Sequence, residues 1–170
     1  MTLHPLRAAP AFVRLATATI RVPAHDPLSA IKTANKLPQI LARAEAEERG
    51  ADEALLLNID GDVAEASSSN LFWIRNGTVG TPPVSAGALA GVTRDVMIEL
   101  CRARQIPVAE ESIARSTLLG MDGIFLTNSG QGIVPVAEID AQKVKSSPMV
   151  PQLQEWLSAA EMTESKSPSA

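Results

Sequence analysis

The sequence predicts an α+β fold built on a mixed sheet, or a mixed barrel. Several short runs rich in β-branched and aliphatic residues are separated by turn signals, and longer segments carry apolar residues at helical spacing. The strands do not alternate one to one with helices, as they would in a doubly wound parallel sheet. With 170 residues, the chain is long enough for one domain with a sizeable core.

The first elements are a strand, a break and a helix. Val13–Val22 is rich in β-branched residues and predicts a strand, which the prolines at 23 and 27 end. An apolar stripe at helical spacing then predicts a helix that ends near Gly50. The stripe consists of Leu37, Ile40, Leu41 and Ala44. Charged residues at 43, 45, 47 and 48 occupy the opposite face, which we expect to be solvated.

Most of the remaining chain predicts strands. They cover Glu53–Asn58, Asn70–Arg75, the residues that lead to Thr81, Ile106–Glu110, Gly123–Thr127 and Ile133–Ile139. Asn76-Gly77 is a strong hairpin signal. Helices are expected over Gly91–Gln105 and Met149–Ala160, and the polar residues Thr163–Ala170 predict disorder.

Composition narrows the possible partners. The formal net charge of −4 and the lack of a basic patch with aromatic residues disfavour nucleic acid. No stretch is apolar enough to span a membrane and no signal peptide is evident, so we expect a cytoplasmic protein. Cys101 lies in an apolar helical pattern and predicts a buried thiol. His4 and His25 have no metal-like companions, so no metal site is predicted.

Two charged residues in small-residue surroundings could carry chemistry. Lys32 lies near the start of the first helix, where partial desolvation would favour the neutral amine that forms a Schiff base. Most lysines at helix starts are simply solvated. Glu65 follows small residues and precedes three serines, and a buried carboxylate there could keep a ring nitrogen protonated. A polar loop between two strands is the alternative interpretation.

Two further segments could bind an anion. Gly91, Val92 and Thr93 open the second predicted helix, where free backbone amides and the helix dipole attract a phosphate. An ordinary helix cap explains the same residues equally well. The segment 127–132 offers hydroxyls, amides and glycines, and it could complete a phosphate site or form a plain hairpin loop. A lysine, a carboxylate and two anion sites together match what pyridoxal phosphate requires.

The order and wording of these segments resemble the fold-type IV pyridoxal-phosphate enzymes, also called class IV aminotransferases. Branched-chain aminotransferase, D-amino-acid aminotransferase and aminodeoxychorismate lyase are members. The resemblance runs from about Ile31 to about Ile139, on the motifs IKTANKL, ADEALLLN, VAEASSSNLFWI, LAGVTRD and FLTNSGQGIVPV. It implies the barrel-like large domain of that fold, pyridoxal 5'-phosphate as cofactor and a homodimer.

The resemblance also implies roles for single residues. Lys32 would hold the cofactor as a Schiff base and later carry the proton between substrate and cofactor, and Glu65 would pair with the pyridine nitrogen. Val92, Thr93 and Ser129 would bind the phosphate. The other implied contacts come from Gly91 at the phosphate, Leu89 on the ring face, and Ser68 and Ser69 near the ring edge.

Three departures from the family pattern bear on function. Members carry a small domain ahead of the lysine, so we interpret residues 1–27 as its remnant plus a linker, 28–161 as the cofactor-binding domain and 162–170 as a disordered tail. Lys36 stands where branched-chain aminotransferases usually have Tyr and the lyases a basic residue, and Ala66 stands where Gly is common. The expected substrate is an amino acid with its keto acid, or aminodeoxychorismate. The alternative is a truncated, non-catalytic domain that binds cofactor weakly or acts only as a partner subunit.

Overall fold

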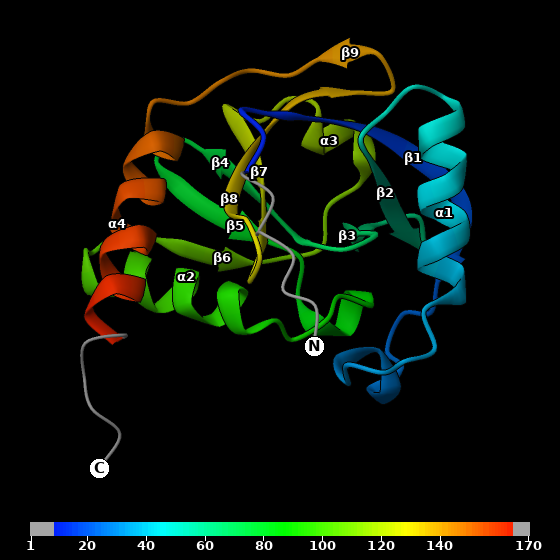
Figure 1. The fold of residues 1–170 in the computed structure, drawn as a ribbon, viewed down its shortest axis with the longest axis horizontal. Coiled ribbons are helices and arrows are strands. Elements are labelled where there is room, and N and C mark those ends of the chain that lie inside the picture. Colours follow the sequence, from blue (N-terminus) through cyan, green and yellow to red (C-terminus); the bar gives the residue numbers. More distant parts are fainter. Residues whose placement is uncertain (1–8, 165–170) are drawn as a thin grey trace, which may run out of the picture.

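The computed structural model describes residues 9–164, and within that range nine strands form one curled sheet (Figure 1). The strands are β1 (Val13–Val22), β2 (Glu53–Asn58), β3 (Val63–Ala66), β4 (Asn70–Arg75), β5 (Thr78–Thr81), β6 (Val108–Glu110), β7 (Gly123–Asn128), β8 (Gly132–Ile139) and β9 (Gln142–Lys143). Their order is β3-β2-β1-β8-β7-β4-β5-β6, with β9 paired to β8. Parallel pairs β1/β2, β1/β8 and β5/β6 stand beside antiparallel pairs, so the predicted α+β mixed sheet is confirmed.

Helices pack on both sides of the curl. They are α1 (Leu37–Glu48), α2 (Val92–Ala103), α3 (Arg115–Leu118) and α4 (Met149–Glu164), with 3-10 turns at Pro27–Ala30 and Val84–Ala86. The helix α1 contacts β1 and β2, whereas α2 contacts β7 and α4 contacts β8 and α2. Figure 1 shows α1 at one side of the sheet and α2 with α4 at the other.

Alternation along the strands divides the core into one inner and two outer layers. In β4, Leu71 and Trp73 face the inner layer, while Phe72 and Ile74 face the layer under α2 and α4. Phe72 stacks on Phe125 of β7 with ring centroids 5.2 Å apart. The second outer layer is rich in alanine and lies between α1 and strands β1 and β2.

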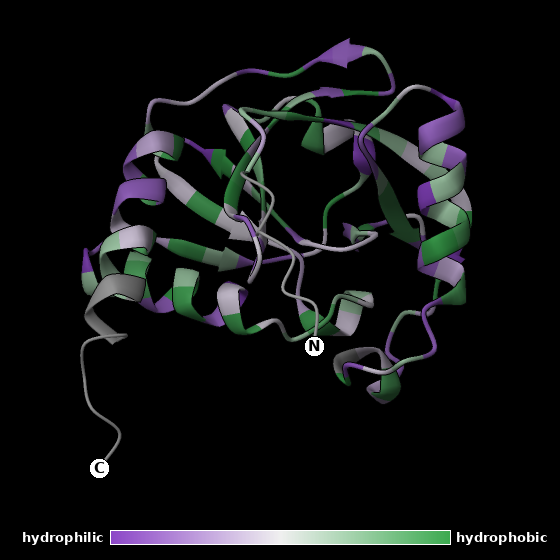
Figure 2. Ribbon diagram, viewed as in Figure 1, coloured by the Kyte–Doolittle hydropathy of each residue, from purple (hydrophilic) through white to green (hydrophobic). Residues whose placement is uncertain are grey.

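The helix α1 forms as predicted, but it buries a different face. The predicted apolar stripe is open to solvent: Leu37, Ile40 and Leu41 are 59%, 61% and 50% exposed. Ala42 and Ala46 are buried in its place, because only small side chains let the helix lie this close to the sheet. Glu45, expected in solvent, accepts hydrogen bonds from the backbone and hydroxyl of Thr19. Figure 2 shows hydrophobic residues in the first turns of this helix.

Other elements differ at their ends or were not predicted. The segment 63–69, for which a polar loop is the alternative interpretation, contains the strand β3, and the short elements α3 and β9 have no sequence signal. The strand β6 starts at Val108 because Pro107 has no N–H for the ladder. The helix α4 runs to Glu164, so predicted disorder is wrong at Thr163 and Glu164, and the rest of that tail lies outside the described residues.

Predictions for several single residues can be compared directly. Cys101 is buried as predicted. His25 lies exposed in the loop after β1, also as predicted, and His4 lies outside the described residues. Within residues 9–164, no helix is long and apolar enough to cross a membrane. The same range holds no group of three or more His, Cys, Asp or Glu side chains that could bind a metal ion.

Candidate active site

A cleft of about 1570 Å³ lies between α1, the start of α2 and the loops that follow β3 and β7. All nine residues that the sequence singles out for the cofactor line it: Lys32, Glu65, Ser68, Ser69, Leu89, Gly91, Val92, Thr93 and Ser129. They come from four separate segments, so the fold has gathered every predicted site residue into one place. Small-molecule sites usually occupy roughly 300–1000 Å³, so this cleft has room for a cofactor and a substrate together.

Glu65 reaches the cleft because β3 carries a β-bulge. Its neighbours pair with β2 as Ala66 with Leu55 and Val63 with Leu57, and Ala64 is the extra residue. Glu65 itself lies opposite Leu56, whose side chain belongs to the layer under α1. Residues directly opposite on paired strands share a face, so the bulge turns Glu65 towards the α1 side.

The carboxyl group of Glu65 is buried and electrostatically unusual. Only 7% of the residue is exposed, and burial raises its pKa from 4.5 to about 7. The backbone N–H of Leu89 donates to its Oε2 at 2.9 Å, which lowers the pKa, as does the charge of Lys36, whereas Glu53 raises it. A carboxyl group with a pKa near neutrality can hold or release a proton at small cost.

The start of α2 is shaped to receive an anion. Its N-cap, Gly91, offers no side-chain cap to the first backbone amides, and Val92 is 78% exposed. A Cβ at Gly91 would lie 2.1 Å from Oδ1 of Asn70, so any larger residue would force the Asn70 side chain to move. Asn70 in turn donates from Nδ2 to the carbonyl of Leu89 at 2.8 Å. Asn70 thus fixes the approach to the helix, a role that sequence reasoning missed.

The loop between β7 and β8 forms a second polar wall. Asn128 holds its turn by accepting hydrogen bonds from the backbone N–H groups of Gly130 at 2.9 Å and Gln131 at 2.8 Å. This arrangement leaves Ser129 exposed at the cleft. The segment 127–132 is therefore a hairpin loop whose residues also line the cleft.

Lys32 is exposed in a loop, whereas the sequence predicts a partly desolvated lysine near the start of the first helix. Lys32 lines the cleft, but it is exposed in the loop that precedes α1 and lies ahead of the first helical residue, Leu37. The partial desolvation predicted for it is absent, because the flanking residues Ile31 and Thr33 are exposed as well. Lys36, the residue just before the helix, is half-buried in the same cleft.

Two buried polar atoms at the cleft lack hydrogen-bond partners. They are Oγ1 of Thr127 at the end of β7 and Oε1 of Gln39 in the first turn of α1, and both residues line the cleft. Buried polar groups are normally paired, by protein or by a bound molecule. Together with the uncapped helix and the perturbed Glu65, these atoms fit a polar, anionic ligand that carries a protonated ring nitrogen.

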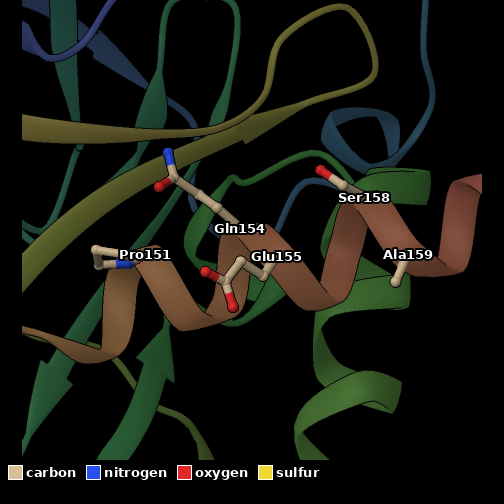
Figure 3. Close-up of a pocket in the computed structure, with 5 residues that line it drawn as sticks. All are labelled: Pro151, Gln154, Glu155, Ser158 and Ala159. Carbon is tan, nitrogen blue, oxygen red and sulfur yellow. The ribbon is translucent and has the colours of Figure 1, made fainter.

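A second, smaller pocket of about 480 Å³ lies along α4 (Figure 3). Pro151, Gln154, Glu155, Ser158 and Ala159 line it. Gln154 donates from Nε2 to the carbonyl of Ile133 at 3.0 Å, which ties the helix to β8. Glu155 is the one ionisable side chain among these lining residues, so the pocket offers no set of reactive groups.

The family model described as Amino-transferase class IV matches residues 1–139. The chain belongs to this family. Its fold is similar to that of a branched-chain aminotransferase from Thermoproteus uzoniensis, with a TM-score of 0.88, 32% identity, and coverage of 96% of this chain and 56% of that one. A protein of Legionella pneumophila assigned as a 4-amino-4-deoxychorismate lyase gives a TM-score of 0.85 at 33% identity, with 92% and 58% covered.

A third similar structure contains the cofactor. It is an aminotransferase from Brucella abortus bound to pyridoxal phosphate, with a TM-score of 0.84, 25% identity, and coverage of 94% of this chain and 57% of that one. The chain spans less than half the length of the curated relatives that it matches first, at 47%, 39% and 38%. The resemblance inferred from the motifs is confirmed at the level of the family.

Proposed function

We propose that this chain forms the cofactor-binding part of a pyridoxal-phosphate-dependent aminotransferase or lyase, with Lys32 as the residue that holds the cofactor. The observation that carries the proposal is the cleft that all nine predicted residues line. The cleft brings together groups that suit different parts of the cofactor: an amine, a buried carboxyl group and an uncapped helix start.

When bound, pyridoxal phosphate supplies an electron sink for charge that develops at the substrate Cα. The exposed amine of Lys32 would attach the cofactor and then move a proton at Cα. Glu65 would keep the ring nitrogen protonated, and the N–H of Leu89 fixes the carboxylate for that contact. Burial raises the pKa of Glu65 to about 7 in the unliganded chain, and a cationic ring beside it would lower that pKa and favour the ionised carboxylate.

The phosphate would sit at the start of α2. Backbone N–H groups of Val92 and Thr93 and the helix dipole favour an anion there, and the Thr93 hydroxyl adds a donor. Ser129 faces the same cleft from the loop after β7. Ser68 and Ser69 line the same cleft, and Leu89 offers an apolar surface for the ring.

Two reactions share these residues. A transaminase would convert an amino acid to its keto acid, and a lyase would release pyruvate from aminodeoxychorismate. Lys36 supports the lyase, because its positive charge beside Glu65 suits an acidic substrate. Assays with D- and L-amino acids and with aminodeoxychorismate would separate the two reactions.

The proposal is tested by adding pyridoxal 5'-phosphate to the purified chain. We expect a yellow absorption band from the lysine-bound cofactor, absent in Lys32→Ala and retained in Lys143→Ala, a control far from the cleft. A band that survives Lys32→Ala would refute the site. A normal band with no turnover on any of these substrates would favour the non-catalytic alternative.

The assembly expected for this family is a homodimer. The exposed apolar residues Ile40 on α1, Phe12 and Val92 line the cleft and would favour contact with a second protein surface. Light scattering across a concentration series tests this expectation. A monomer at every concentration would contradict it.

A further inference from the structure

We infer that Glu53 is a positioning residue that sets the geometry of both polar loops of the cleft, and thereby the strength with which the cleft binds the phosphate of its ligand. The inference rests on the proposed function, since it takes pyridoxal phosphate as the ligand. Glu53 lies within the motif ADEALLLN, but neither the resemblance nor the proposed mechanism gives it a role. The two loops are the serine loop, residues 67–69, and the turn at 128–131.

Glu53 is a buried acid whose hydrogen bonds all come from the serine loop. It is 5% exposed at the start of β2. The backbone N–H of Ser68 donates to Oε1 at 2.6 Å and its hydroxyl donates at 2.9 Å. The hydroxyls of Ser67 and Ser69 approach Oε1 and Oε2 at 3.5 and 3.4 Å. Among the residues that the structure describes, no Lys or Arg forms an ion pair with it, so these donors hold the group.

A second link joins the serine loop to the turn that carries Ser129. Asn128 donates from Nδ2 to the Ser69 hydroxyl at 3.0 Å, and its Oδ1 accepts from the backbone of the turn. The Ser69 hydroxyl therefore accepts from Asn128 while it donates towards Glu53. One continuous chain of hydrogen bonds runs from Glu53 to the turn, although Glu53 contacts no residue of that turn directly.

This series of hydrogen bonds would matter for ligand binding because few other interactions fix the two loops. Residues 67–69 and 129–131 have neither helix nor strand geometry, and no disulfide or metal-binding cluster holds them in the described residues. Without the Glu53 carboxylate, the backbone N–H and the hydroxyl of Ser68 would lose a charged acceptor, and short bonds of this kind are among the stronger ones in proteins. The longer contacts of the Ser67 and Ser69 hydroxyls would be lost as well. The loops would then occupy several geometries, and a ligand phosphate would have to order them.

The test compares two ligands that differ only in the phosphate. Pyridoxal 5'-phosphate and pyridoxal are titrated by absorbance into the wild-type chain and into Glu53→Ala, Glu53→Gln and Asn128→Ala. The ratio of the two dissociation constants measures what the phosphate contributes. We expect this ratio to fall about tenfold in Glu53→Ala and in Asn128→Ala, about the effect of losing one hydrogen bond. Glu53→Gln should fall less, because its carbonyl can still accept from Ser68.

A double variant tests whether Glu53 and Asn128 act through the same series of hydrogen bonds. The double variant Glu53→Gln/Asn128→Ala should show the loss of Asn128→Ala alone, because both changes break one chain. Glu99→Gln, on the exposed side of α2, is the matched control and should keep the wild-type ratio. In the unliganded chain, the amides of Gly130 and Gln131 should exchange hydrogen severalfold faster in Glu53→Ala than in Glu99→Gln.

Failure of the inference and failure of the proposed function give different results. If the wild-type chain forms no cofactor band, the proposed function is wrong and the inference falls with it. If the band forms but both ligands weaken equally in Glu53→Ala, the residue supports only the fold and the inference is wrong. Unchanged amide exchange in Glu53→Gln and Glu53→Ala would overturn the link to the turn.

Discussion

Replacement of Glu65 by glutamine should make the unliganded protein more stable at alkaline pH. The pKa of Glu65 is raised by burial to about 7 in the folded state, against 4.5 in a solvated chain. A raised acid pKa means that the folded state holds a proton that the unfolded state has lost between these pH values. Stability from this group is therefore complete below about pH 4.5 and is lost as pH rises through about 7.

The size of the effect follows from that interval. At about 1.4 kcal/mol per pKa unit, the ionised Glu65 costs the folded state at most about 3 kcal/mol above neutrality. Glutamine carries no charge, and its carbonyl can still accept from the N–H of Leu89. The Glu65→Gln variant should therefore gain up to that amount over the wild type between acid and alkaline pH, while it weakens cofactor function.

Urea unfolding of both proteins between about pH 4.5 and about pH 8 measures the difference. Groups that titrate alike in both proteins cancel, and Glu99→Gln provides an exposed control that should follow the wild type. A wild-type curve that runs parallel to that of Glu65→Gln across the interval would refute the reasoning. It would mean that Glu65 is ionised in the fold at moderate pH, as a solvated or ion-paired carboxylate would be.

Four further outcomes are expected. Gly91→Ala should lower the free energy of unfolding by about 1–3 kcal/mol and weaken cofactor binding, because its Cβ would collide with Asn70. Ala42→Leu should lower the free energy of unfolding by a similar amount, whereas Ile40→Gln should change it by less than about 0.5 kcal/mol in the same urea experiment. If Ile40→Gln were the more destabilising, the apolar stripe predicted from the sequence would be the buried face after all. Asp140→Asn should cost roughly 1–2 kcal/mol near neutrality. Burial raises the pKa of Asp140, but bonds from Thr17 and Arg115 outweigh it and the pKa is lowered, so the loss should shrink as pH falls through that lowered value. Cys101 is buried with its pKa raised by burial to about 11, so a thiol reagent at about pH 8 should label it only after unfolding.

The sequence could predict the elements whose signals are local. Runs of β-branched residues, the Asn76-Gly77 turn and the glycine before α2 each act over a few residues, and the structure has strands, a hairpin and a helix there. Asn76 and Gly77 both have positive φ, of 50° and 77°, as such a turn requires. The short elements β3, α3 and β9 depend on tertiary pairing, and their residues carry no comparable signal.

The buried face of α1 could not be predicted from its apolar stripe. Hydrophobic spacing assumes that large apolar residues face the core, but the available gap decides which residues fit. Against β1 and β2 the helix contributes only alanine to the buried layer, Ala42 and Ala46, and most of the facing residues are alanine as well. Two opposite faces of this helix are apolar by sequence, and only packing distinguishes them.

In the site, too, the residue types could be predicted from the sequence, but the placement of their side chains could not. A lysine, a glutamate and glycine-rich loops identify the chemistry, yet strict alternation along β3 would put Glu65 on the same side as Val63, within the inner core. The bulge at Ala64 reverses this and brings the carboxyl group to the side of Lys36. Glu53 is the converse case, because an acid at the start of a strand usually indicates a solvated edge. Its burial under three serines becomes visible only when residues fourteen to sixteen positions away return beside it. For both acids, then, the proposed role depends on a reversed face or an unexpected burial that no local pattern encodes.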